Sequence, residues 1–180
     1  MREHRRQQRE TPWHAVVTVA EVAETGEHVA LVADAETRAA VAKVAGLRDL
    51  PRLEARFDLS PHSGGGLRVT GRVSATVGQT CVVTLEPLAN DVEEDIDLLY
   101  MPPAAAAARD ESEAEAKTDE AEPLIGGTVD LGTLATEFLL LGIDPYPRKP
   151  DAVFDAPRAD GPEPGPFAAL AGLMKNRDGS

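Results

Sequence analysis

The stretch Leu53-Glu-Ala-Arg-Phe-Asp-Leu59 alternates between apolar and charged side chains, and after the turn Pro61-His-Ser-Gly-Gly-Gly66 the alternation resumes in Leu67-Arg-Val-Thr-Gly-Arg-Val-Ser-Ala-Thr-Val77. Such alternation is typical of β-strands that bury one face and expose the other. A short glycine-rich connection between two such runs predicts an antiparallel hairpin. We therefore expect this hairpin to form the centre of the fold.

Further strands are expected on both sides of the hairpin. Residues 13–20 are rich in β-branched side chains and are predicted to pair with residues 28–33 as a hairpin around Gly26. Downstream, residues 80–85 are predicted to form another strand. A last strand follows, and one of its faces carries Val92, Glu94, Ile96, Leu98 and Tyr100. The strands together predict an antiparallel meander with one buried face.

A first helix is predicted over residues 37–45, between an N-cap at Asp34 and a stop at Gly46. Its spacing places Val41, Val44 and Ala45 on one apolar face, which we expect to lie on the sheet.

A second and more apolar helix is predicted over residues 131–141, between a cap at Asp130 and a glycine stop at Gly142. Residues 167–174 could form a third, short amphipathic helix. The predicted fold class is therefore α+β, an antiparallel meander with two or three helices packed on it.

The chain of 180 residues is expected to hold one domain with flexible flanks. Residues 13–103 supply the sheet and the first helix, and residues 123–150 complete the same domain. Residues 104–122 are alanine and acid, with too little apolar surface to offset the entropy of ordering, so they predict a disordered linker, with a marginal exposed helix as the alternative. Residues 1–12 and 151–180 are predicted to be a basic disordered tail and a flexible tail.

The net charge of −13 restricts the partners, because an acidic surface repels phosphate. Broad RNA binding and DNA binding are not expected, and RNA contact is at most local. One basic spot is the start of the chain, which is more simply interpreted as a solvated tail; it carries Arg2, Arg5, Arg6 and Arg9.

The sequence predicts a cytoplasmic protein without membrane contact. No run approaches the roughly 18 apolar residues that a membrane span requires, and the start Met1-Arg-Glu-His-Arg-Arg6 lacks the apolar stretch of a secretory signal. The single cysteine, Cys81, excludes an internal disulfide and a multi-cysteine metal site. We expect it to be a small buried side chain, because Val82 and Val83 supply no positive charge to stabilise a thiolate.

No pattern typical of a phosphate loop, a metal pair or a nucleophile elbow occurs, so we predict no catalytic residues, no metal and no cofactor. A dense carboxylate cluster is nevertheless present, and alternation places Glu93, Asp95 and Asp97 on one face, where they are expected to repel. A solvated face is the simplest interpretation, and a docking surface for a basic protein is the functional one. A small carboxylate or metal-dependent hydrolase using Asp91 to Asp97 is the alternative, and it requires a concave pocket around them.

The segment Asp144-Pro-Tyr-Pro-Arg-Lys-Pro150 cannot be a helix or a central strand, because its prolines lack donors and fix φ. It is expected to be extended and exposed, with the Tyr146 ring beside the cations Arg148 and Lys149 as a recognition site. Alternatively, the prolines pin the chain as it leaves the second helix, and Tyr146 packs on the sheet.

This segment, Gln79-Thr-Cys-Val-Val-Thr-Leu-Glu-Pro87 and Gly127-Thr-Val-Asp-Leu-Gly132 resemble, in order and spelling, the alphaproteobacterial branch of the YceD family, the large ribosomal RNA subunit accumulation proteins. The resemblance extends over about residues 13–174. Many members carry a second cysteine where this chain has Thr84, so a metal site built on that pair would lack a ligand here.

The resemblance implies a role in the build-up of large-subunit ribosomal RNA. Together with the absence of catalytic motifs, it leads us to expect a non-enzymatic factor that contacts the large-subunit precursor, a basic ribosomal protein or another assembly partner. The residues expected to contact the partner are Tyr146, Arg148, Lys149, Glu93, Asp95 and Asp97.

Overall fold

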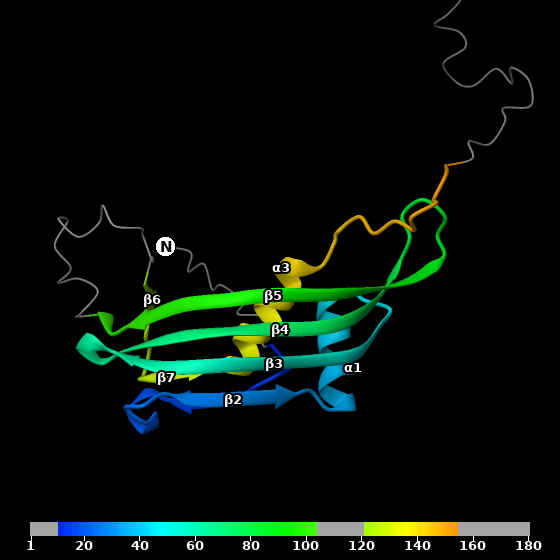
Figure 1. The fold of residues 1–180 in the computed structure, drawn as a ribbon. Helices are drawn as coiled ribbons and strands as arrows, with labels where there is room; N and C mark the ends of the chain where they lie inside the picture. The colour runs from blue at the N-terminus through cyan, green and yellow to red at the C-terminus, as the bar shows by residue number, and fades with distance from the viewer. Residues whose placement is uncertain (1–10, 104–120, 155–180) are drawn as a thin grey trace, which may run out of the picture.

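The computed structural model describes residues 11–103 and 121–154. Five strands form the main sheet in the order β2-β3-β4-β5-β6, and two short strands, β1 and β7, form a second sheet (Figure 1). Residues 1–10, 104–120 and 155–180 lie outside the described part, and with them nearly all of the predicted basic tail and acidic linker and the predicted terminal helix. The elements are β1 (Val16–Thr18), β2 (Glu27–Val32), α1 (Ala35–Ala45), β3 (Asp49–His62), β4 (Gly66–Thr80), β5 (Pro87–Met101), β6 (Glu122–Pro123), β7 (Thr128–Asp130) and α3 (Leu131–Gly142).

The hairpin of β3 and β4 is the centre of the main sheet, as the alternating sequence predicts. Leu59 lies opposite Val69 in an antiparallel register that continues along both strands. Gly64 and Gly65, in the connecting turn, have positive φ angles of 75° and 76°, which glycine adopts without steric cost. The inward-facing side chains of the hairpin are at most 2% exposed, and they are Leu53, Ala55, Phe57, Leu59, Leu67, Val69, Val73, Ala75 and Val77.

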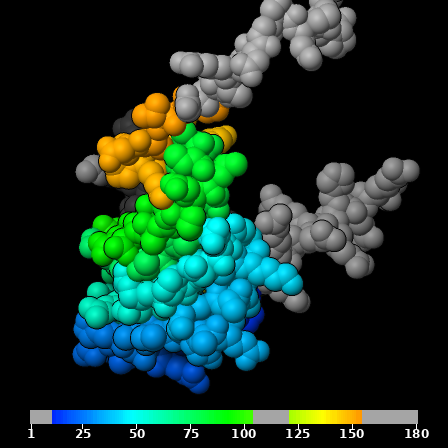
Figure 2. Space-filling model, turned by 90° about the vertical axis from the view of Figure 1, so that its right-hand side faces the viewer, coloured from blue at the N-terminus to red at the C-terminus, as the bar shows by residue number. Residues whose placement is uncertain are grey.

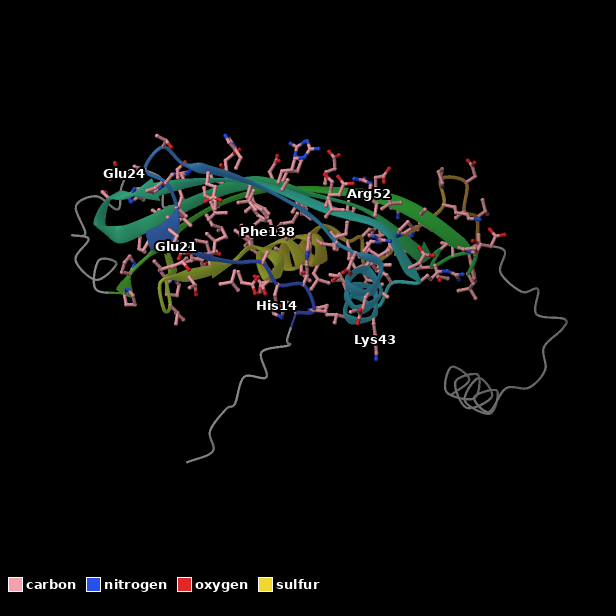
Figure 3. All side chains as sticks on the ribbon, turned by 90° about the horizontal axis from the view of Figure 1, so that it is seen from below. His14, Glu21, Glu24, Lys43, Arg52 and Phe138 are labelled. Atoms are coloured by element: carbon pink, nitrogen blue, oxygen red, sulfur yellow. The ribbon has the colours of Figure 1, made fainter. Side chains whose placement is uncertain are left out.

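Both helices cover the same face of the main sheet (Figure 1, Figure 3). The charged side chains of the alternating strands, apart from Glu94 on β5, lie on the opposite face, which is open to solvent. Among the described residues, the aromatic side chains of the buried core are those of Trp13 and Phe57. Neither α1 nor α3, the helices of the described part, is long and apolar enough to cross a membrane. The predicted α+β class with a mostly antiparallel sheet is confirmed.

The prediction that the first two strands pair with each other is wrong. β1 pairs with β7, with Val16 opposite Asp130, whereas β2 pairs with β3. The chain leaves β1 through a 3₁₀ turn over Val19–Glu21, and the Val19 amide donates to the Gly127 carbonyl oxygen at 2.9 Å. The backbone of residues 16–19 is therefore hydrogen-bonded to residues 127–130, which are far away in the sequence. A local sequence pattern does not predict such a pairing.

The predicted strand over residues 80–85 is also absent, because β4 ends at Thr80 and β5 begins at Pro87. The residues between them form a loop with two backbone hydrogen bonds of its own. The Leu85 amide donates to the Cys81 carbonyl oxygen, and the Cys81 amide donates to the Glu86 carbonyl oxygen, both at 2.9 Å. The β-branched residues Val82 and Val83, on which the strand prediction rests, thus lie in a loop.

The cap and the stop of α1 are confirmed. The Asp34 carboxylate accepts a hydrogen bond from the Thr37 amide at 2.7 Å, and Gly46 ends the helix in a left-handed conformation. On the face toward the sheet, Val41 is fully buried and Ala42 is buried, while Val44 and Ala45 are half-buried.

Helix α3 begins at its predicted cap, and the Asp130 carboxylate accepts from the amides of Gly132 and Thr133 at 3.1 and 3.2 Å. Its end has a different cause from the one predicted, because the cap residue is Ile143 in an extended conformation rather than a left-handed glycine. At Gly142 a Cβ atom would lie 2.5 Å from the Glu94 carboxylate. Glycine is therefore needed there for the close approach of α3 to β5.

Candidate functional site

The two segments that the sequence singles out meet at one end of the main sheet. The loop of residues 81–86 lies beside the segment of residues 144–150, and we call the two together the tip (Figure 1, Figure 2). The Val82 amide donates to the Pro147 carbonyl oxygen at 2.9 Å, and the Lys149 ammonium lies 2.7 Å from the Glu86 carboxylate. Backbone and side-chain bonds thus join two parts of the chain that are far apart in sequence.

Cys81 lies at the junction of these two parts. Its side chain is fully buried, as predicted, but its Sγ atom also accepts hydrogen bonds from the amides of Thr84 at 3.4 Å and Lys149 at 3.5 Å. Hydrogen bonds from Thr84, and then from the Lys149 amide, lower the pKa of the thiol to about 6, against an opposing effect of burial. The sulfur therefore serves as an internal acceptor that holds the tip together.

The proline-rich segment separates its side chains into anchors and exposed groups. Pro147 is buried and Lys149 is half-buried, whereas Arg148 is exposed. The Tyr146 side chain is exposed, at 70%, so it does not pack on the sheet, and its amide donates to the Asp144 carboxylate at 2.8 Å. Of the predicted recognition residues, Tyr146 and Arg148 are thus available to a partner.

Lys149 is engaged within the tip instead. Its hydrogen bond to the Glu86 carboxylate, with the attraction of its charge, lowers the pKa of that carboxyl. The pair is partly exposed, so its contribution to stability is small. The pair attaches the segment of residues 144–150 to the loop of residues 81–86.

The loop adds apolar surface that sequence reasoning missed. Leu85 is 76% exposed and Val82 is 44% exposed. Leu85 also has a φ of +60°, a left-handed conformation that costs energy for a side chain with a Cβ atom. The available signal is that Val82 and Leu85 are apolar residues just before Pro87, but a strand prediction over residues 80–85 does not leave them exposed. Leu85 and Tyr146 are thus exposed side chains on the two joined segments of the tip.

The predicted acidic residues lie elsewhere, on the open face of the main sheet. Asp95 on β5 receives two hydrogen bonds from the Arg72 guanidinium on β4, at 2.7 and 3.1 Å, and Asp97 receives two from Arg68, at 2.9 and 2.7 Å. Glu93 lies 3.6 Å from Arg72. The expectation that these carboxylates simply repel one another is therefore wrong, because arginines on the neighbouring strand lie between them.

These pairs also bear on the hydrolase alternative. The hydrogen bonds from Arg72 lower the pKa of Asp95, whereas a general acid requires a raised one. Asp95 and Asp97 line a depression of about 420 Å³ on the open face, and their side chains remain 74% and 56% exposed. This is an open charged surface rather than a cleft that excludes water.

No metal site is evident in the part of the chain that the structure describes, because no three His, Cys, Asp or Glu side chains come together there. At the position where a second cysteine would stand, Thr84 supplies an amide to the Cys81 sulfur instead of a ligand.

The fold and the tip define a small α+β protein that exposes one charged sheet face and one loop surface. A family model matches residues 69–173, which include both halves of the tip and more than half of the chain; its description is large ribosomal RNA subunit accumulation protein YceD. The chain therefore belongs to the YceD family. No curated protein and no solved structure is significantly similar to it.

Proposed function

We propose that this chain supports the accumulation of large-subunit ribosomal RNA as a binding factor rather than as an enzyme, and that it contacts its assembly partner through the tip. The family description supports the process. The tip supports the mode of action, because it exposes apolar and aromatic side chains while Lys149 and Glu86 pair with each other.

The observation that carries this proposal is the exposure of Leu85 on one of the two joined segments and of Tyr146 and Arg148 on the other. The bond from Val82 to Pro147 and the acceptor sulfur of Cys81 hold the surface in place before a partner arrives. Such preorganisation reduces the entropy lost on binding.

A protein partner fits this surface better than RNA does. Leucine and tyrosine are apolar contact groups, and Arg148 pairs with a carboxylate as readily as with phosphate. The net charge of −13 disfavours extensive contact with RNA but attracts a basic ribosomal protein.

The open face offers a second contact for such a partner through Glu93, Asp95 and Asp97. Because Arg68 and Arg72 already pair with these residues, we expect it to contribute less affinity than the tip. We expect the open face to raise the rate at which the partner associates rather than to hold it tightly.

Affinity purification of the tagged full-length chain, with the RNA and the proteins both identified, tests the proposal. Leu85→Asn suits the left-handed conformation and removes the apolar contact, so it should reduce co-purification of large-subunit precursors without loss of stability. Val32→Ser is the matched control, because Val32 is 74% exposed on β2, outside the tip. Equal recovery by wild type and Leu85→Asn would contradict the proposal.

A further inference from the structure

A groove lies between α1 and the chain that enters β3. Its volume is about 530 Å³, and the alanines of the outer face of α1 line one side of it. Leu50 and Pro51 line the other side, where the pairing of β3 with β4 is interrupted between Asp49 and Arg52. The groove has the size of pockets that hold small ligands.

The backbone around the groove is fixed. The Leu47 amide donates to the Ala42 carbonyl oxygen at 2.9 Å, and the Arg48 amide donates to the Gly78 carbonyl oxygen at 2.8 Å. These bonds tie the end of α1 and its following turn to β4. The groove is therefore part of the folded domain and not a gap between moving parts.

Cations surround this groove in an otherwise acidic protein. Arg38, Lys43 and Arg48 line it, and Asp49 is the one acidic residue among its lining residues. The Arg38 guanidinium donates to the Ala33 carbonyl oxygen at 2.7 Å, which orients it. Within the described residues, neither the Lys43 ammonium nor the Arg48 guanidinium forms a hydrogen bond or an ion pair.

The two unpaired cations come from different elements around the groove. Lys43 extends from α1 away from the sheet (Figure 3), and Arg48 is exposed on the turn that follows the helix. By contrast, the arginines Arg68 and Arg72 on the open face are already paired with carboxylates. The groove is thus a place where the described surface presents positive charge that is not already neutralised.

We propose that this groove binds the phosphate backbone of single-stranded RNA. The Arg48 and Lys43 side chains would pair with successive phosphates, and Arg38, held by its bond to Ala33, would donate its remaining N–H groups. The small side chains of Ala35 and Ala39 leave room for the sugar. The inference rests on the proposed function only in taking large-subunit ribosomal RNA as the source of the phosphate.

The chemistry of the groove predicts weak and strongly salt-dependent binding. Each phosphate contact on a single strand contributes a slope of about −0.7 in a plot of log affinity against log salt, so up to three contacts give about −2. The acidic remainder of the protein opposes association and confines the RNA to this local site.

Fluorescence anisotropy of a labelled single-stranded RNA of about 12 nucleotides, taken from large-subunit ribosomal RNA, tests the proposal at roughly 50 mM salt with the full-length chain. Arg48→Glu should weaken binding by at least about 10-fold. Arg56→Glu is the matched control, since Arg56 is an exposed arginine on the open face and the change in net charge is the same. It should alter binding by no more than about two-fold.

A second variant keeps all three cations. Ala39→Glu places a carboxylate in the groove from an exposed position on α1, where glutamate is a good helix former, so the variant should fold. It should weaken RNA binding as Arg48→Glu does. Unchanged melting temperatures in both variants establish that the fold is intact.

The proposal is overturned if the wild-type chain does not bind the RNA, or if Arg56→Glu weakens binding as much as Arg48→Glu. It is also overturned if poly-glutamate of equal charge competes as well as RNA, because the groove would then fit an acidic protein segment. The Leu85→Asn variant distinguishes this proposal from the proposed function, because it should no longer bind the assembly partner through the tip but should still bind RNA in the groove.

Discussion

The amide nitrogen of Val82 donates a hydrogen bond to the carbonyl oxygen of Pro147 at 2.9 Å, and this bond joins the β4–β5 loop to the segment that follows α3. The Glu86–Lys149 pair and the Cys81 sulfur lie beside it. Leu85 and Tyr146 are consequently exposed on two segments that are bonded to each other, although the sequence separates them.

Lys149→Met should loosen this surface without unfolding the domain. Because both charges of the Glu86 pair are partly exposed, we expect only a small loss in the free energy of unfolding. Amide hydrogen exchange at Val82 should become faster. Arg148→Met is the control, since Arg148 is exposed, and equal exchange rates in the two variants would show that the pair does not brace the tip.

The Cys81 thiol should make stability depend on pH above neutrality. Its pKa falls from 9.0 to about 6 on folding, so the unfolded chain binds more protons between these values. The stabilising contribution is fully present above pH 9 and is lost as the pH falls through 6. The difference in unfolding free energy between wild type and Cys81→Ser should therefore grow from pH 6 to pH 9, measured by urea unfolding; a constant difference would contradict the assigned hydrogen bonds.

Asp130 should contribute stability that is lost in acid. Burial opposes its ionisation, but hydrogen bonds from the Ala15 amide, from His14 and from Thr133 prevail and lower its pKa from 3.8. Its contribution is present above the unfolded pKa and is lost as the pH falls through the folded one. Asp130→Asn should cost about 0.5–2 kcal/mol at pH 7, and the difference from wild type should begin to shrink below about pH 4 and disappear once the pH has fallen below the lowered pKa of the folded carboxyl.

Gly142→Ala should destabilise the contact between α3 and β5. An added Cβ atom would lie 2.5 Å from the Glu94 carboxylate and 2.7 Å from a Val92 methyl carbon. We expect a net loss of about 1–2 kcal/mol, because overpacking outweighs the higher helix propensity of alanine. Adding Val92→Ala should recover part of this loss, and strictly additive effects of the two changes would contradict the close approach.

Local sequence patterns predict the central hairpin of the fold but not the pairing of β1 with β7. The alternation in β3 and β4 and the caps Asp34 and Asp130 are recognisable from residues close together in the sequence, and the structure confirms them. The pairing of β1 with β7 could not be predicted, because strands of three residues carry no periodicity and their partners are distant. The loop of residues 81–86 resembles a strand in composition, but its amides bond within the loop and to Pro147 rather than to a neighbouring strand.

The sequence predicts several residues of the candidate site but not the contact between its two segments. Exposure of Tyr146 and Arg148 follows from the prolines, whereas the use of Lys149 as a brace depends on Glu86, which only the folded chain brings near. The pairing of Arg72 with Asp95 does not follow from the sequence prediction, because that prediction places a strand over residues 80–85 between the strands that carry them. The structure has no such strand, and β4 and β5 are direct neighbours.

The central claim is that the tip supports large-subunit ribosomal RNA accumulation through contact with a partner. The most direct measurement is the ratio of mature large-subunit to small-subunit ribosomal RNA in cells whose only copy of this chain carries Leu85→Asn and Tyr146→Ser. The tip account predicts that this ratio falls while the protein stays folded and abundant, and that Val32→Ser leaves it unchanged. A normal ratio with the tip variant would contradict it.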